Sequence, residues 1–350
     1  MHDRREHIID LVNLEIGFRK GKGREQSLAG PVNTSAYSGE LIAVMGRNGS
    51  GKSTLLRTIA GLMDGLQGEI HILSSKLAAY SRKELARIMG YVSTEVVRVP
   101  GLSVESLVAL GRYPHTKWLG KLNSSDQEVI ERALDMTSLQ ALRDRDLDEL
   151  SDGERQRAMI ARTLAQDTQI LILDEPTAFL DLSHRYEIID LLGNLTLDHG
   201  KTVIYSTHDL QIALQQADKI WLIHKQEMLE GAPEDMVLSG RLSDALRQTD
   251  SGTEIEMDPQ TGEFAVKRVL RQDISLSSGH DGLSGPDGLR TWTKKALERN
   301  GFRVMENKKT GIHVLIDIEG GSPGWILEKS GRRVEFNSIY DLSLYLRTIN

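Results

Sequence analysis

Residues 41–62 read LIAVMGRNGSGKSTLLRTIAGL, and this stretch decides the fold class. The apolar run 41–45 predicts a buried strand, and 52–62 has the apolar spacing of a helix. A glycine-rich loop joins them. Further short apolar runs rich in β-branched residues, ILIL at 170–173 and TVIYS at 202–206, predict central strands. Together these elements indicate an α/β fold built on a mostly parallel sheet.

The loop matches the pattern G-x-x-x-x-G-K-[ST] and stands between a strand and a helix, as this pattern requires. Its glycines let successive backbone N–H groups turn toward an anion, and the helix start adds its positive dipole end. We expect Lys52 to supply charge to the β- and γ-phosphates, Ser53 to ligate Mg2+ and Thr54 to assist. An accidental glycine-rich turn is the alternative, which the strand and helix context disfavours. The predicted phosphate-binding residues are Gly46, Arg47, Asn48, Gly49, Ser50, Gly51, Lys52, Ser53 and Thr54.

Two carboxylates follow the strand ILIL, where the metal of a bound nucleotide would be held. Asp174 is predicted to hold Mg2+, and Glu175 to orient and deprotonate the attacking water. An acidic residue after a strand is ordinarily a solvated loop charge or a helix cap, but the upstream phosphate loop reverses that expectation. His208, after the strand TVIYS, is predicted near the γ-phosphate, although a lone histidine there is often only structural. The predicted catalytic residues are Glu175, His208 and Lys52.

Composition excludes several classes of protein. The formal net charge of -7 disfavours a nucleic-acid-coating protein, so no nucleic-acid partner is expected. The chain has no cysteine, which rules out disulfides, thiolate metal sites and a cysteine nucleophile. No stretch approaches the roughly 18 apolar residues of a membrane span, so any membrane role is expected to be peripheral.

The 350 residues predict two domains. Amphipathic helical patterns fill residues 81–166, where Ser125 with Glu128 predicts a capping box. Turn-rich stretches follow Trp221, and a Gly/Ser/Asp-rich loop begins near residue 277. We place a domain boundary near Arg271, giving domains of 1–270 and 271–350. The second alternates predicted helices and short strands and is expected to be a small α+β unit of unassigned role.

Residues 150–157, LSDGERQR, resemble the signature LSGGQ of the ABC ATPases. They stand just ahead of a helix and of the carboxylate pair, and DEPTAFLD continues into the family's D-loop with Asp181. The resemblance covers about residues 8–270. It implies a P-loop NTPase cassette of the ABC type, with a mostly parallel core sheet, N-terminal antiparallel strands and a helical subdomain at about 81–166. It also implies ATP hydrolysis with ATP and Mg2+ as cofactors.

In the ABC family two cassettes pair head to tail, so that each ATP lies between the phosphate loop of one copy and the signature of the other. The resemblance therefore assigns Ser151, Gly153, Glu154 and Asp181 to nucleotide binding and implies a second copy of the chain as partner. Phe18 matches the family's aromatic position that stacks on adenine, whereas an isolated aromatic is otherwise most often a core residue.

The segment 107–114, LVALGRYP, makes the chain similar to the siderophore, haem and cobalamin importer branch. Members of that branch drive polytopic permease subunits fed by a substrate-binding protein, and they sit peripherally on the cytoplasmic face of the inner membrane. Taken as a turn, GRYP would simply end a helix. Two alternatives stay open, a soluble ABC ATPase and a nucleotide-gated regulator without a permease.

Two positions depart from the family pattern. Thr94 stands where a glutamine is expected, with Glu95 beside it, so either residue is a candidate metal ligand in its place. Asp152 occupies a glycine-like slot of the signature, close to where a negative ligand would bind. We expect Asp152 to cap the helix or form a local salt bridge.

Overall fold

The computed structural model describes residues 6–20, 24–94, 99–116, 121–246, 255–257, 264–266, 270, 272–278, 287–305, 310–319 and 322–349. The chain divides into two compact units, the first Met1–Leu246 with Met257–Glu263 and the second Arg247–Glu256 with Phe264–Asn350. Each unit has its own cluster of buried apolar side chains. Each therefore has the core that an independent domain needs.

A six-stranded sheet forms the centre of the first unit, in the order β10-β9-β3-β8-β7-β6. All neighbouring strands run parallel except β10, which pairs antiparallel with β9. Every residue of β7 and β8 is buried, as expected for parallel strands covered on both faces. The predicted fold class is thus confirmed. The strands are β3 (Leu41–Gly46), β6 (Met89–Val92), β7 (Ile170–Leu173), β8 (Thr202–Ser206), β9 (Lys219–His224) and β10 (Glu227–Gly231).

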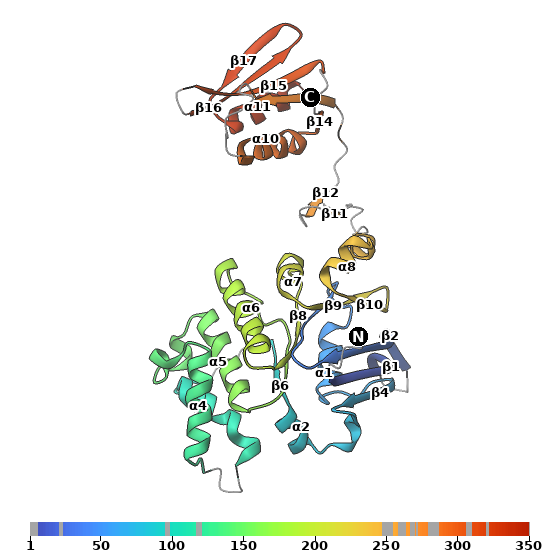
Figure 1. Cartoon of the computed structure of the whole chain (residues 1–350), viewed down its shortest axis with the longest axis vertical. Helices are drawn as coiled ribbons and strands as arrows, with labels where there is room; N and C mark the ends of the chain where they lie inside the picture. Colours follow the sequence, from blue (N-terminus) through green and yellow to red (C-terminus); the bar gives the residue numbers. More distant parts are fainter. Residues whose placement is uncertain are drawn as a thin grey trace. The chain divides into compact units, whose positions relative to one another are not determined.

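A second, antiparallel sheet lies beside this core, in the order β2-β1-β4-β5. Its apolar side chains share one buried cluster with helix α1 (Lys52–Ile59) and with the central strands. Figure 1 shows β1, β2 and β4 on one side of the first unit and the helices α4 and α5 on the other. The strands are β1 (His7–Lys20), β2 (Arg24–Tyr37), β4 (Gln67–Ile72) and β5 (Ser75–Lys76).

The segment 81–166 is mainly helical, but it also contains β6, which joins the central sheet. The predicted capping box of Ser125 is wrong. A cap at Ser125 would start the helix at Asp126, but α4 begins at Ser124 and is capped by Asn123. The Asn123 side chain accepts the Asp126 N–H, and the Asp126 carboxylate accepts the Asn123 N–H. The helices are α2 (Arg82–Ile88), α3 (Val104–Ala109), α4 (Ser124–Met136) and α5 (Asp152–Ala165).

The GRYP segment does more than end a helix. It forms a 3-10 helix, η2 (Leu110–His115), from which Arg112 is almost fully buried. The Arg112 guanidinium lies 2.9 Å from an Asp126 carboxylate oxygen and donates to the Ala165 carbonyl at 2.9 Å. Arg112 therefore joins η2 to the start of α4 and the end of α5. The remaining helices of this unit are α6 (Leu182–Leu197), α7 (Leu210–Gln216), α8 (Pro233–Leu238) and α9 (Arg241–Leu246).

The second unit is built on a five-stranded mixed sheet in the order β14-β13-β15-β16-β17. Side chains of the two helices α10 and α11 pack on this sheet to form the buried cluster. The expected small α+β architecture of the C-terminal region is confirmed. Its elements are β13 (Gln272–Ser278), α10 (Asp287–Arg299), β14 (Phe302–Met305), β15 (Ile312–Glu319), β16 (Ser322–Lys329), β17 (Arg332–Phe336) and α11 (Ile339–Ile349), and a separate two-stranded sheet comprises β11 (Ile255–Met257) and β12 (Phe264–Val266).

Candidate active site

The predicted site segments meet at one edge of the central sheet. The phosphate loop follows β3, Asp174 follows β7, His208 follows β8 and Thr94 follows β6. These four strands are adjacent and parallel, so their carboxyl ends lie along the same edge. That edge is where ligands bind in open α/β sheets.

Glycines shape the phosphate loop between β3 and α1. A side chain at Gly46, whose φ is 151°, would place its Cβ 2.9 Å from the Ile223 carbonyl oxygen. Gly51, with φ 108°, is the N-cap of α1 and offers no side-chain cap. The first-turn N–H groups of α1 are therefore left for a ligand, and an anion is the ligand that they and the helix dipole favour.

Lys52 is buried and folds back over its own loop. Its Nζ donates to the carbonyls of Gly46 at 3.0 Å and Arg47 at 3.4 Å. Burial lowers the pKa of Lys52, while the nearby carboxylates of Glu175 and Asp174 act in the opposite direction. Both carboxylates thus lie within electrostatic reach of this ammonium group.

The Ser50 hydroxyl is buried and has no hydrogen-bond partner among the residues that the structure describes. A buried hydroxyl without a partner is unfavourable, so it calls for an external acceptor. Ser50 lies in the turn closed by its own N–H, which donates to the Arg47 carbonyl at 3.0 Å. The loop therefore fits a phosphate group, whose oxygens accept hydrogen bonds.

Asp174 is the centre of the hydrogen-bond network at this edge. Its Oδ1 accepts from the hydroxyls of Ser53 and Ser206, both at 2.8 Å, and its Oδ2 accepts from the Tyr91 hydroxyl at 3.4 Å. Asp174 is 1% exposed. Burial raises the pKa of Tyr91, which keeps this phenol a hydrogen-bond donor.

Ser53 and Asp174 together fit a Mg2+ ion. This ion is usually held by one or two protein oxygens, with substrate phosphates and water completing its octahedron. Within the described ranges no group of three or more His, Asp or Glu side chains is arranged to hold a metal by itself. The remaining ligands would therefore come from the nucleotide and from water.

Glu175 has an unusual backbone conformation. Its φ of 49° lies in the left-handed region, which costs a non-glycine residue about 1–2 kcal/mol. Its N–H donates to the Ser206 hydroxyl at 2.8 Å, and its carbonyl accepts from the Ala178 N–H at 3.0 Å. Strain of this kind persists where surrounding contacts fix it, commonly at active sites.

The other predicted residues around the site differ in their surroundings. His208 is exposed in the turn after β8. The Thr94 hydroxyl donates to the Asp174 main-chain carbonyl at 2.9 Å, which links the end of β6 to the backbone that follows β7. Glu95 lies outside the described residues.

Phe18 lies on β1 and is 42% exposed, so the alternative of a core residue is wrong. Two residues earlier on the same strand, the Ile16 side chain lies against Gly51, where an added Cβ would be 3.1 Å from its Cδ1. The pairing of β1 with β2 shifts register between Ile16 and Gly17, and Phe18 is an exposed aromatic side chain two residues from this contact.

The signature residues begin α5. Ser151 is its N-cap and forms a capping box with Glu154. Asp152 forms an ion pair with Arg155 at 2.8 Å, which confirms the expected local salt bridge. The side chain of Asp152 is thereby neutralised on the protein's own surface rather than left facing a ligand.

Gly153 and Asp181 connect the signature helix to α6. A Cβ at Gly153 would lie 2.7 Å from the His184 ring, so a larger residue there would have to displace that ring. Asp181 is the N-cap of α6 and accepts from the His184 N–H at 3.0 Å and lies 2.8 Å from its ring Nδ1. The His184 N–H, then the Ser183 hydroxyl and the His184 ring, lower the pKa of Asp181 to about 2.

Sequence reasoning missed two residues of the site, Ser206 and Tyr91. Ser206 ends the apolar run of β8 and is fully buried, and Tyr91 lies within β6. The available signal for Ser206 was its place at the polar end of β8, whereas Tyr91 precedes the last residue of β6. Neither position could be interpreted without knowing that β6 and β8 flank β7 in the sheet.

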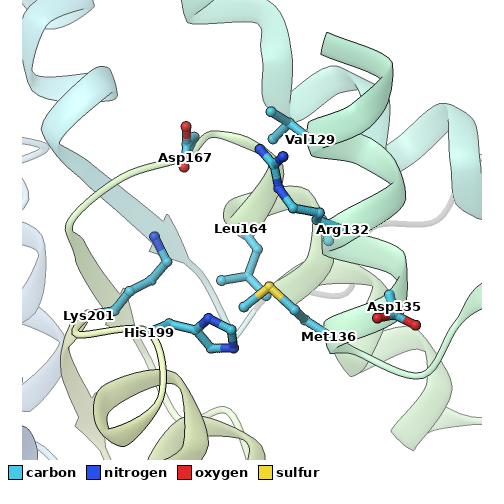
Figure 2. A pocket seen from close by; sticks show the side chains of 9 residues that line it. Val129, Arg132, Asp135, Met136, Leu164, Asp167, His199 and Lys201 are labelled. Carbon is cyan, nitrogen blue, oxygen red and sulfur yellow. The ribbon is translucent and has the colours of Figure 1, made fainter. Parts of the chain in front are cut away.

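A separate pocket of about 350 Å3 lies away from this edge. Figure 2 shows its charged lining, with Arg132 on α4 and Asp167, His199 and Lys201 on loops. Asp167 and Lys201 precede β7 and β8, so they lie at the amino ends of strands whose carboxyl ends form the candidate site. The pocket contains none of the predicted site residues. Its lining comprises Val129, Arg132, Ala133, Asp135, Met136, Leu164, Asp167, His199 and Lys201.

Comparison with known proteins identifies the family. Residues 29–178 match the family described as ABC transporter, and residues 282–347 match the iron ABC transporter C-terminal domain. The chain is 38% identical over 232 residues to the petrobactin import ATP-binding protein FpuD of Bacillus anthracis, covering 66% of this chain and 84% of that protein. It is also 38% identical over 225 residues to the ferric enterobactin transport ATP-binding protein FepC of Escherichia coli K12, covering 64% and 81%.

Solved structures agree with this assignment. The dimeric structure of a bacterial ABC transporter cassette has a TM-score of 0.57 and 28% identity, covering 65% of this chain and 99% of that one. A post-hydrolysis state of that cassette with ADP and phosphate has a TM-score of 0.56 and 29% identity, covering 65% and 99%. None of the helices in the described parts of the chain combines the length and apolar character of a membrane span. The chain belongs to the ATP-binding subunits of ABC transporters, which hydrolyse ATP to power transport.

Proposed function

We propose that this subunit drives import of a ferric siderophore through a membrane permease. The hydrogen-bonded pair of Ser53 and Asp174 beside Lys52 supports the ATPase part, because a hydroxyl and a carboxylate oxygen next to the phosphate loop are ligands of the kind that Mg2+ takes. The import part is supported by the siderophore importers among its relatives and by the iron-transporter C-terminal match. Haem or cobalamin is the second choice of cargo.

The phosphate loop holds the nucleotide in this proposal. Amides from Gly46 to Gly51, the Ser50 hydroxyl and Lys52 contact the β- and γ-phosphates, with Arg47, Asn48, Gly49 and Thr54 completing the loop. Phe18 stacks on adenine. Ser53 and Asp174 would hold Mg2+, which would supply positive charge that stabilises the phosphoryl group during transfer.

Glu175 acts as the base. It orients a water molecule in line with the bond between the γ-phosphorus and the bridging β-oxygen, and it accepts a proton as the water attacks. That bond breaks, and ADP leaves with the bridging oxygen. His208 contacts the γ-phosphate, and Thr94 keeps β6 attached to the carboxylate turn.

A second copy completes each site. Ser151, Gly153 and Glu154 at the start of α5, together with Asp181, face the nucleotide held by the partner's phosphate loop. The relation to a dimeric cassette supports this arrangement. Loss of the γ-phosphate removes contacts that bridge the copies, so the dimer opens after hydrolysis.

Residues 1–270 form the ATP-binding domain and 271–350 an accessory domain in this proposal, and the match at 282–347 supports the second. The subunit sits on the cytoplasmic face of the inner membrane, bound to permease subunits that receive cargo from a substrate-binding protein. The importer relatives support this location.

Uptake of a radiolabelled ferric siderophore tests the proposal. Cells lacking the gene are expected to lose uptake, wild-type chain to restore it, and Glu175→Gln to accumulate normally without restoring it. Co-purification of the chain with a polytopic permease is the second expected result. Undiminished uptake in the deletion strain, with labelled haem or cobalamin uptake lost instead, would replace the proposed cargo.

A further inference from the structure

One serine hydroxyl touches both carboxylate residues of the candidate site. Ser206, the last residue of β8, is fully buried. Its hydroxyl donates to Asp174 Oδ1 at 2.8 Å and accepts from the Glu175 N–H at 2.8 Å. A hydroxyl has one proton to donate, so this pair of bonds fixes it in a single orientation.

The Ser206 hydroxyl supplies an acceptor for a backbone N–H that leaves the sheet. Asp174 is still held by the sheet, since its N–H donates to the Val92 carbonyl at 2.9 Å. The next residue, Glu175, leaves the strand with φ 49°. The Glu175 N–H consequently points to the neighbouring strand β8, where Ser206 supplies the acceptor.

Neighbouring hydroxyls have other partners or belong to other elements. Thr207 directs its N–H to the Val44 carbonyl, and its hydroxyl accepts from the Asp209 N–H at 3.0 Å. Ser53 also donates to Asp174 Oδ1, but it belongs to the phosphate loop. Tyr91 on β6 also donates to Asp174, at the longer distance of 3.4 Å, but Ser206 is the sheet residue that bonds to Asp174 and Glu175 together.

We propose that Ser206 is a positioning residue for hydrolysis, which holds the metal-binding carboxylate and the turn of the catalytic base in fixed relation. This inference rests on the proposed role of Glu175. Loss of a hydrogen bond behind a reacting group misplaces that group, and such losses typically reduce turnover by about 10- to 100-fold. Nucleotide affinity depends mainly on the phosphate loop and should change little.

Three variants of the full chain test the role. Ser206→Ala should lower kcat for ATP by about 10- to 100-fold, while the Kd for a fluorescent ATP analogue stays within about threefold of wild type. Ser206→Thr and Ser206→Val add nearly the same bulk, but only Thr keeps a hydroxyl. Thr should therefore retain at least about tenfold more activity than Val, even if Ala folds poorly.

Thr163→Val is the matched control, since Thr163 is buried and its hydroxyl donates to the Met159 carbonyl within α5, away from the candidate site. It should lower the thermal midpoint without changing kcat per folded molecule. Glu175→Gln is the reference for the base. If Glu175→Gln is inactive while Ser206→Ala and Ser206→Val keep wild-type kcat, the inference on Ser206 is overturned and the proposed function stands. If Glu175→Gln keeps wild-type kcat, both are overturned.

Discussion

At the scale of single residues, the neighbours Asp174 and Glu175 differ in how they are held. Asp174 is fully held by the sheet and by three hydroxyls, whereas Glu175 has a backbone conformation that glycine would adopt more easily. Glycine would relieve the backbone and remove the carboxylate. The chain thus keeps a strained residue whose carboxylate is the catalytic base in the proposed function.

Glu175→Gln is expected to reduce steady-state ATP hydrolysis by at least about 100-fold, because the amide keeps the shape of the side chain but cannot take a proton. ATP binding should persist. Phosphate release under saturating MgATP measures the first, and equilibrium dialysis the second. Wild-type turnover in the variant would remove Glu175 from the role of base.

Lys52→Met is expected to abolish ATP binding and, at the same time, to raise the thermal midpoint of the nucleotide-free chain. Burial lowers the folded-state pKa of Lys52, so the charged form is disfavoured by folding at neutral pH. The cost of burying the charged Lys52 is present below its folded-state pKa and is lost as pH rises through that pKa, so the free energy of unfolding of the wild type increases there. Methionine carries no such cost at any pH. Calorimetry should therefore show the difference between variant and wild type shrinking toward high pH. A lower midpoint for Lys52→Met at neutral pH would contradict this reading.

At the scale of elements, the helical region depends on a buried ion pair that no periodicity reveals. The side chains of Arg112 and Asp126 are 8% and 5% exposed. The Asn123 N–H, then the Arg112 guanidinium, lower the pKa of Asp126, so the carboxylate stays charged in the interior. One arginine consequently fixes three helical elements.

Arg112→Met is expected to destabilise the chain by about 3–5 kcal/mol, because it leaves a buried carboxylate without its cation. Adding Asp126→Asn should recover part of the loss, since Asn removes the stranded charge and can still cap through hydrogen bonds. Urea unfolding of the two single variants and the double variant measures this coupling. If the loss of unfolding free energy in the double variant equalled the sum of the losses in the two single variants, Arg112 and Asp126 would contribute independently and the expected coupling would be absent.

Strands β3, β7 and β8 were predictable, because an apolar run indicates a buried strand and the glycine or polar residues that follow it indicate where the strand ends. The phosphate loop, Asp174 and Glu175 followed from their order along the chain. The Asn123 cap was missed because Ser124 and Ser125 offer equally good capping side chains, and the choice depends on the Arg112 contact to Asp126. Ser206 was missed because its role exists only once β8 lies beside β7.

At the scale of the whole molecule, each chain has two hydrophobic cores and one signature segment. Each unit has its own buried cluster, and the first carries every described residue of the candidate site. Since each chain has a single phosphate loop and a single signature, the proposed dimer contains two nucleotides and two copies of the C-terminal unit.

Ser151→Asp in the Glu175→Gln background is expected to prevent ATP-dependent dimerisation. Aspartate is as good an N-cap as serine, so α5 should be preserved, but its charge would face the partner's γ-phosphate. Ser338→Asp is the matched control, because Ser338 accepts the Asp341 N–H at the start of α11 in the second unit. Light scattering with MgATP should give a dimer for the control and a monomer for Ser151→Asp. A dimer in both would exclude the signature from the interface.

The contact between Gly51 and Ile16 joins the phosphate loop to the antiparallel sheet of the cassette. Gly51 belongs to the phosphate loop, and Ile16 belongs to the antiparallel sheet that also presents Phe18. In the proposed function, stacking on the base belongs to one sheet and bond cleavage to the other, and the two meet at a glycine without a side chain. Exchanging Phe18 for leucine is therefore expected to weaken nucleotide binding while leaving the residues of cleavage in place.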